Sequence, residues 1–239
     1  MNPIRILYFA AIWQRQELTR LHFANLRRMI DYKPDRFQIT PHFAVSEDWA
    51  ADLCREHDFS FTHAQNKPIG AKLNAGLKPR ILEHFDFLLT MGSDDFVEPT
   101  FLDSFLPYFQ SLDAFGLNEL HVLDALTGKQ KRVIIGYCYG ALRCIRWKYV
   151  QQAALIGEGE CQAYRGLWEP MRNQGLDFYS MEALKERTGV SIVPVKIKER
   201  LWDVKDGQNI NSFRKVGGEE INLPLSEIPQ EIRHLAAIK

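Results

Sequence analysis

The chain lacks several features that would assign a class of protein directly. Its 239 residues hold 30 Lys and Arg against 30 Asp and Glu, so no basic excess favours nonspecific nucleic-acid binding. No apolar stretch is long enough to cross a bilayer, and the N-terminus lacks the pattern of a secretory signal. The four cysteines have no zinc-ligand spacing and are too few for a disulfide scaffold. We therefore expect a cytoplasmic protein without a membrane span.

The first part of the chain alternates between two hydrophobic periods. Apolar runs or alternations at 4–12, 39–45, 59–63 and 85–92 predict strands, and helical spacing predicts helices near 19–30, 46–57 and 70–83. Pro41 indicates that the early part of the second strand lies at an edge or bulge. Repeated strand-helix alternation is typical of an α/β protein with a mainly parallel, Rossmann-like central sheet flanked by helices. At this length we expect one domain over 1–239.

The pattern is less regular after Pro99. We predict a helix from about Pro99, strands at 121–123 and 133–137, helices near 146–156 and 180–187, and a strand at 190–197. The end of the chain, 201–239, is expected to be an irregular tail or lid. Within it, Leu201–Phe213 is predicted to be either an ordinary solvated loop or a lid that brings Asp203 or Lys205 toward a ligand.

The most informative motif is an apolar strand that ends on two adjacent carboxylates, Asp94 and Asp95. Ligands collect at the carboxyl ends of parallel strands, and neighbouring carboxylates repel each other unless a cation, a proton or a basic side chain compensates them. Mg²⁺ or Mn²⁺ prefers such oxygen ligands. The alternative is that one of the two residues turns the chain or caps the helix that follows.

A second motif precedes it. The segment Pro68-Ile69-Gly70-Ala71-Lys72-Leu73-Asn74-Ala75-Gly76 is a turn-rich loop that leads into a helix, where backbone amides and Lys72 would suit a diphosphate. Gly70 permitting a turn and Lys72 lying on a solvated helix face is the structural alternative.

The order of these pieces resembles the nucleotide-sugar half of GT-A fold glycosyltransferases, especially the inverting family 2. That family reads Gly, small, Arg or Lys, Asn, small, Gly in the loop, and then an apolar strand that ends in an Asp-x-Asp-Asp type motif. Here Gly92 stands at the first acidic position of that motif. The resemblance covers roughly the first half, so 1–96 is expected to bind the nucleotide sugar and 97–200 the acceptor.

The resemblance also implies roles for individual residues. Ala10 and Ala11 would lie against the nucleotide base, and Ser46 and Glu47 would contact base or ribose. Lys72, Asn74 and Asp94 would contact the rest of the donor, and Asp94 and Asp95 would hold Mn²⁺ or Mg²⁺. The segment Gly140-Ala141-Leu142-Arg143 looks like the family's Gly, apolar, apolar, Arg loop.

The catalytic base is expected in the second half. The family's Glu-Asp motif is absent, and Asp177, at a predicted helix start, is the first candidate, with Glu169 the second. A helix cap is the structural alternative for Asp177. Trp13, Trp168, Tyr137, Tyr139 and Trp202 are candidates for stacking on sugar rings.

The expected activity is metal-dependent, inverting transfer of a sugar, with a UDP-sugar favoured as donor. The acceptor remains open between a glycan, a protein, a lipid-linked sugar and a modified nucleobase. A sugar-phosphate nucleotidyltransferase is the alternative enzyme, although the loop after the first strand, Ala10 to Arg15, lacks the glycines such enzymes carry. A non-catalytic nucleotide- or sugar-binding module is the third possibility.

Overall fold

The computed structural model describes residues 2–157, 162–207 and 213–237. Its strands are β1 Ile4–Ile12, β2 Phe37–Val45, β3 Ser60–His63, β4 Phe87–Gly92, β5 Asp95–Phe96, β6 Ala114–Gly116, β7 Glu119–Asp124, β8 Gln130–Ile134, β9 Arg143–Arg146, β10 Leu155–Ile156, β11 Ala163–Tyr164, β12 Val193–Pro194, β13 Trp202–Lys205 and β14 Glu219–Ile221. The α-helices are α1 Gln16–Asp31, α2 Asp48–Glu56, α3 Ile69–Leu77, α4 Phe101–Ser111, α5 Trp147–Ala154, α6 Leu176–Thr188 and α7 Arg233–Ala236. Short 3₁₀ turns are η1 Lys78–Arg80, η3 Phe213–Lys215, η4 Leu225–Glu227 and η5 Gln230–Ile232.

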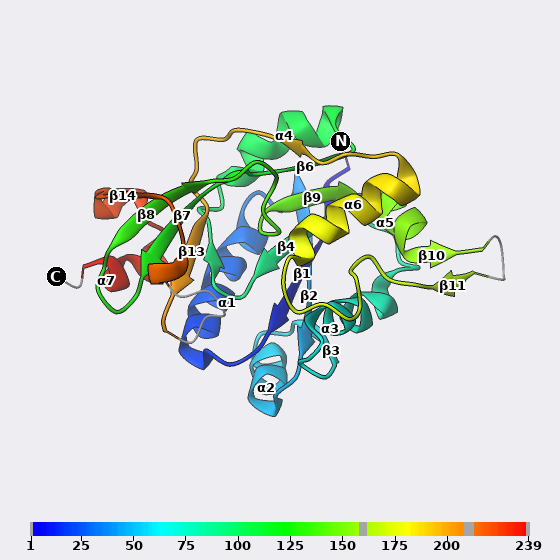
Figure 1. The fold of residues 1–239 in the computed structure, drawn as a ribbon, viewed down its shortest axis with the longest axis horizontal. Helices are drawn as coiled ribbons and strands as arrows, with labels where there is room; N and C mark the ends of the chain where they lie inside the picture. Colours follow the sequence, from blue (N-terminus) through cyan, green and yellow to red (C-terminus); the bar gives the residue numbers. More distant parts are fainter. Residues whose placement is uncertain (1, 158–161, 208–212, 238–239) are drawn as a thin grey trace.

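The strands form a large central sheet and a smaller one. The central sheet has the order β12-β6-β9-β4-β1-β2-β3, and the smaller sheet has the order β14-β8-β7-β13-β5. The smaller sheet and α7 lie at one side of the molecule, and the β10-β11 ribbon projects at the other (Figure 1). Within the described residues, no helix is both long and apolar enough to cross a membrane.

The central sheet confirms the predicted mainly parallel α/β architecture. β1 pairs in parallel with β2 and β4, and β3 pairs in parallel with β2. Among the described strands of this sheet, only β9 runs against its neighbours β4 and β6. Pro41 falls where only β1 flanks β2, because pairing with β3 begins at His42 and Ser60. The missing N–H of proline is tolerated on the open side, as the sequence predicts.

Both faces of the sheet are buried, which explains the continuous apolar runs of its strands. Successive side chains of β1 alternate between two cores: Tyr8 and Ala10 pack on one face, and Phe9 and Ala11 on the other. α1, α2 and α4 contribute to the first core, and α3, α5 and α6 to the second. Because the side chains of β1 alternate, Phe9 and Ala11 are on the face that carries α3 and α6, and Tyr8 and Ala10 are not.

The second half differs from the expectation in three places. The strand expected over 190–197 shrinks to β12, and the expected loop at Arg143 begins β9, whose Cys144 is fully buried between β4 and β6. The expected tail contains β13, paired on both sides in the smaller sheet. Residues 202–205 therefore do not form the predicted loop or lid, and residues 208–212 of that prediction lie outside the described residues.

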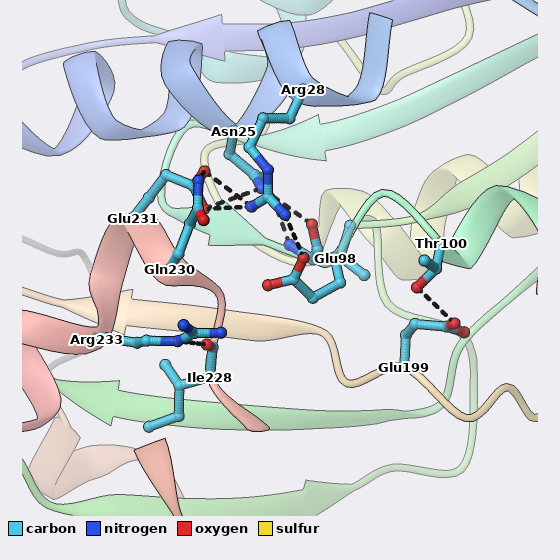
Figure 2. A network of polar contacts seen from close by, with 10 residues as sticks. Asn25, Arg28, Glu98, Thr100, Glu199, Ile228, Gln230, Glu231 and Arg233 are labelled. Atoms are coloured by element: carbon cyan, nitrogen blue, oxygen red, sulfur yellow. Dashed lines mark hydrogen bonds and ion pairs between the residues drawn. The ribbon is translucent and has the colours of Figure 1, made fainter. Parts of the chain in front are cut away.

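A polar network fixes the chain that follows β5 (Figure 2). Arg28 of α1 donates to Glu231 of η5 at 2.9 Å and to Glu98 at 2.6 Å. Asn25, one turn earlier, donates to the carbonyl of Val97 at 3.0 Å. The Glu231 side chain is only 5% exposed, whereas Arg28 and Glu98 are 33% and 31% exposed, so the network is partly shielded from solvent. Segment 97–98 is thereby held between α1 and η5.

Candidate active site

Three carboxylates meet at the carboxyl end of β4. Asp94 and Asp95 lie at the junction of β4 and β5, and Asp203 comes from β13. Antiparallel pairing sets Asp203 directly opposite Asp95, and the Val204 amide donates to the carbonyl of Asp94 at 2.9 Å. One carboxylate oxygen from each of the three residues lies within 4.8 Å of the others. Strand register therefore assembles the cluster from two distant parts of the chain.

Two cations accompany the cluster. Arg15, between β1 and α1, places Nη1 2.6 Å from Asp94 Oδ2 and donates through Nη2 to Ser93 Oγ at 3.1 Å. Lys205, two residues after Asp203 on the same face of β13, has its Nζ 2.6 Å from Asp203 Oδ2 and 3.8 Å from Asp94 Oδ2. Three carboxylates thus share two positive side chains.

The protonation equilibria reflect this imbalance. Burial, followed by repulsion from Asp94 and Asp203, raises the pKa of Asp95 well above its usual value. Burial and the Asp94 charge raise the pKa of Asp203 to about 6. Burial also opposes ionisation of Asp94, but Arg15 and Lys205 outweigh it and hold the pKa of Asp94 below normal. The cluster therefore has more carboxylate than its own cations neutralise.

The donor set fits a divalent cation. Asp203 Oδ1 is buried and, among the described residues, has no hydrogen-bond partner. A buried acceptor of this kind calls for a partner, and carboxylate oxygens are the ligands that Mg²⁺ and Mn²⁺ prefer. A cation here would also relieve the repulsion that raises the pKa of Asp95.

A hydrogen bond from α1 fixes the backbone of Asp95. His22 is fully buried, and burial lowers the pKa of its imidazole to about 4, so the ring is neutral at pH 7. The Asp95 carbonyl can only accept, so Nδ1 of His22 donates to it at 3.0 Å. Nε2 then accepts from the Tyr8 hydroxyl at 2.8 Å. His22 and Asn25, on one stripe of α1, therefore fix the chain at Asp95 and at Val97.

A cavity of about 250 Å³ opens beside the cluster on the α3 and α6 side. It is lined by Phe9, Ala11, Ile69, Leu73, Thr90, Met91, Gly92, Asp95, Gly140, Ala141, Arg143, Trp168 and Asp177. Asp95 and Asp177, predicted from opposite halves of the sequence, therefore share one cavity. A Cβ at Gly140 would lie 2.1 Å from Asp177 Oδ1, so only glycine leaves room for this carboxylate.

Arg143 fixes the start of α6, where Asp177 lies. This fully buried guanidinium donates to Ser180 Oγ at 2.7 Å and to the backbone carbonyl of Asp177 at 3.2 Å. Burial lowers its pKa, and the Asp177 charge opposes that shift. Among the described residues no side chain caps α6, and the N-cap residue Gly175, just before the helix, is left-handed with φ 67°. Arg143 therefore positions Asp177 through the backbone.

Glu169, the second candidate base, faces a different space. It lines a separate hollow of about 430 Å³ together with residues of α6 and does not line the cavity shared by Asp95 and Asp177. The structure thus brings Asp177, and not Glu169, to the cavity beside the acidic cluster.

The donor-loop residues are engaged inside the protein. Lys72 is 1% exposed, and its Nζ donates to the Ile12 carbonyl, to Ser46 Oγ at 2.9 Å and to Asn66 Oδ1 at 3.2 Å. Burial lowers the pKa of Lys72 to about 8, against the opposing charge of Glu47. The Lys72 side chain therefore ties together the ends of β1 and β2 and the loop before α3, and it does not line the cavity.

Asn74 holds a loop of the second half. Its Nδ2 donates to the Trp168 carbonyl at 2.7 Å, and its Oδ1 accepts from the amides of Leu167 and Trp168 at 2.9 and 3.0 Å. A Cβ at Gly166 would lie within 2.6 Å of this amide. Asn74 therefore shapes the wall that Trp168 contributes to the cavity.

The residues expected at the base site lie at the ends of β1 and β2. Ala11 lines the cavity, whereas the Ala10 side chain points into the opposite core. Ser46 accepts from Lys72, and Glu47 Oε2 accepts from the Gln14 amide at 2.6 Å. Ala11 is the member of this set that reaches the cavity.

The sequence does not predict several features of the site. Arg15 carries no signal that links it to Asp94, and Asp203 and Lys205 are predicted in a solvated loop or a lid rather than in a strand. Tyr139 has a buried hydroxyl with no partner among the described residues, and burial, then Tyr137, Asp203 and Asp177, raise its pKa. The alternation of Trp202-Asp203-Val204-Lys205 was the signal that could have revealed β13.

Comparison with known proteins was made by sequence and by structure. No family profile and no curated protein sequence matches the chain. Among solved structures, it is similar to S. aureus TarS 1–349, with a TM-score of 0.55 and 12% identity over 84% of this chain and 60% of that one. It is also similar to the mannosyltransferase PcManGT from Pyrobaculum calidifontis in complex with GDP-Man and Mn²⁺, with a TM-score of 0.55 and 10% identity over 88% and 59%.

These similarities establish the fold. The central, mostly parallel sheet flanked by helices is that of GT-A glycosyltransferases, as the sequence resemblance predicts. A further TarS structure, in complex with UDP-GlcNAc, matches with a TM-score of 0.50 and 12% identity, covering 86% of this chain and 60% of that one. The chain thus spans less than two thirds of the length of these structural relatives.

Proposed function

We propose that this protein is a metal-dependent, inverting glycosyltransferase that moves a sugar from a nucleoside-diphosphate sugar to an acceptor hydroxyl. The observation that carries the proposal is that Asp95 of the acidic cluster and Asp177 of α6 line one cavity at the carboxyl ends of β1 and β4. Active sites of open α/β sheets lie at this edge. The GT-A fold of the structural relatives supports the same reaction class.

The acidic cluster would serve the leaving group. Asp94, Asp95 and Asp203 would hold Mn²⁺ or Mg²⁺, which supplies positive charge next to the departing diphosphate. Arg15 and Lys205 already stand at the cluster and would bind and orient the same phosphate oxygens. Asp203 and Lys205 would thus act from strand β13 and not from a lid.

Asp177 would serve the acceptor. An acceptor hydroxyl is a poor nucleophile at neutral pH, so a carboxylate must take its proton as the new bond forms. Arg143 and Gly140 position Asp177 on the cavity that Asp95 also lines. The buried hydroxyl of Tyr139, which has no partner among the described residues, would donate to the sugar or the phosphate.

Buried residues would hold the loops that form the donor site. Lys72 and Asn74 would contribute by fixing the loops around the donor, and Ala11, Ser46 and Glu47 by forming the base pocket at the ends of β1 and β2. A UDP-sugar is the favoured donor. Similar folds bind UDP-GlcNAc in TarS and GDP-Man in PcManGT, which supports a nucleotide sugar as the donor class.

A donor-hydrolysis panel tests the proposal. The protein is incubated with nucleotide sugars and Mn²⁺, and release of nucleoside diphosphate is measured for the wild type and Asp95→Asn. Slow release that depends on Asp95 supports the transferase. Turnover that requires pyrophosphate would instead indicate the nucleotidyltransferase, and nucleotide binding without any turnover would indicate the binding module.

A further inference from the structure

Three aromatic rings lie exposed beside the candidate base. Tyr137, Phe178 and Tyr179 are 40%, 43% and 37% exposed. They touch in series: the rings of Tyr137 and Phe178 are 6.0 Å apart at 71°, and those of Phe178 and Tyr179 are 5.4 Å apart at 86°. Large rings left in water without a packing role in the core mark a binding surface more often than isolated exposed aliphatic residues do. We call these three residues the aromatic ledge.

The ledge lies next to the candidate base in the chain. Phe178 follows Asp177 directly in the first turn of α6, and Asp177 lines the cavity shared with Asp95. On its other side, Tyr179 lines the 430 Å³ hollow that also contains Glu169. An extended molecule whose reacting hydroxyl reaches Asp177 therefore has the ledge within reach of its neighbouring units.

The charged residues that line the 430 Å³ hollow limit which class of molecule the ledge would bind. The hollow carries three carboxylates and two guanidinium groups: Glu169, Glu182, Glu186, Arg172 and Arg187. Planar polar groups next to aromatic rings suit a ligand with both C–H faces and hydroxyl edges, because the rings cover the apolar faces and the polar groups bind the hydroxyls. The hollow offers no excess of positive charge to a polyanionic acceptor, and its charged lining does not suit a lipid chain.

We propose that the acceptor is an uncharged oligosaccharide whose sugar rings rest on the aromatic ledge while its terminal hydroxyl points to Asp177. The proposal rests on the proposed function and names the class of acceptor for the same site. Arg172, whose guanidinium lies 3.4 Å from the centre of the Tyr179 ring, covers that ring, so Phe178 and Tyr137 carry the contact with sugar.

The experiment is binding of the full chain, with UDP and Mn²⁺ present, to a printed array of neutral oligosaccharides. At least one oligosaccharide class is expected to bind the wild type. The double variant Phe178→Ala with Tyr137→Ala should bind that class about tenfold more weakly, because it removes both rings that would contact the sugar. Ile134→Ala, which removes an exposed apolar side chain (57% exposed) from β8, is the matched control and should bind like the wild type.

Each outcome bears on a different claim. Binding of no oligosaccharide, or equal binding by the double variant, overturns the proposal, and so does preferential binding of polyprenyl phosphate vesicles or of a single-stranded oligonucleotide. The melting temperature of the double variant and its affinity for UDP show that it is folded. If the wild type itself binds no nucleoside diphosphate, the proposed function fails; if it hydrolyses donor and ignores every oligosaccharide, only the acceptor class fails.

Discussion

The proposed donor side and the proposed acceptor side of the cavity are built differently. On the donor side, the charged side chains are already engaged within the protein: Lys72 has three acceptors, and Arg15 and Lys205 are paired with carboxylates. On the acceptor side, Phe178 and Tyr137 are exposed to solvent. The difference indicates a preorganised electrostatic half, whose groups need not reorient when charge develops, beside a half that is open to its ligand.

The sharpest test of this division removes the proposed base. Asp177→Asn keeps the side-chain size while losing proton abstraction, so transfer should fall about 10²- to 10⁴-fold. Donor affinity should change little, because the residues proposed to bind the donor lie on the other side of the cavity. Steady-state transfer and UDP calorimetry check both halves of the expectation. Glu169→Gln is the matched control, and loss of transfer in that variant alone would move the base to Glu169.

Removing a carboxylate from the donor side should act on the leaving group. Asp95→Asn is expected to lower the rate about a hundredfold, or roughly 3 kcal/mol of transition-state stabilisation. The measurement is the rate of nucleoside diphosphate release against Mn²⁺ concentration. Asp58→Asn, at an exposed left-handed position that asparagine tolerates, is the control. A variant at Asp95 that keeps full, metal-independent activity would exclude this metal site.

A substitution of Asn74 tests whether this residue stabilises the loop around the cavity or binds the donor directly. Asn74→Ala leaves the Trp168 carbonyl and two buried amides without partners, so the free energy of unfolding should fall by on the order of 3 kcal/mol. Urea unfolding measures this change. Asn118→Ala, which removes a single 3.5 Å hydrogen bond, should cost far less. Unchanged stability together with weaker donor binding would make Asn74 a direct donor ligand.

The buried Lys72 should make the free energy of unfolding depend on pH. Its pKa is about 8 in the folded protein, below the 10.5 of the free side chain, so the unfolded chain holds the proton over the interval between these values. The cost of burying this charge is present below pH 8 and disappears as pH rises toward 10.5, so stability should rise in that window by at most about 3 kcal/mol. Urea unfolding at pH 7 and pH 10 should show a smaller rise for Lys72→Met. An identical rise in both proteins contradicts the expectation.

The smallest effect concerns the base of the donor. We expect UDP to bind about tenfold more tightly than ADP, or roughly 1.4 kcal/mol, in the presence of Mn²⁺. The expectation follows from the sequence resemblance, in which UDP-sugars are the common donors, and Ala11 at the end of β1 is the expected base-site residue that lines the cavity. Isothermal calorimetry measures both affinities, and equal affinities for UDP and ADP would refute the predicted preference for UDP.

Much of the donor half could be predicted because its signals are local. The strands from β1 to β4 are long apolar or alternating runs with clear ends, so the position of Asp94 and Asp95 at a strand end follows from the sequence. The first helices follow from their spacing in the same way. What spacing does not contain is the internal use of Lys72 and Asn74, because both depend on loops that pack against α3 only in the folded chain.

The secondary structure of the second half is harder to predict from the sequence, for a physical reason. Its strands are short, and β13 spans four residues in a polar stretch, so its pairing with β5 and β7 depends on distant segments. β9 carries arginines at both ends, which hides a buried strand behind a loop-like composition. The helix start at Asp177 is a local signal, whereas the placement of Asp177 and Asp95 on one cavity depends on tertiary structure.

The pairing of β5 with β13 also sets the order in which the protein can become competent. A growing chain emerges N-terminus first, so Asp94 and Asp95 exist before Asp203 and Lys205 are made. The third carboxylate arrives only when β13 docks against β5, and Glu231 then closes on Arg28. Cation binding would therefore report completed folding, and ligands that need the whole cluster would stabilise the native chain by mass action.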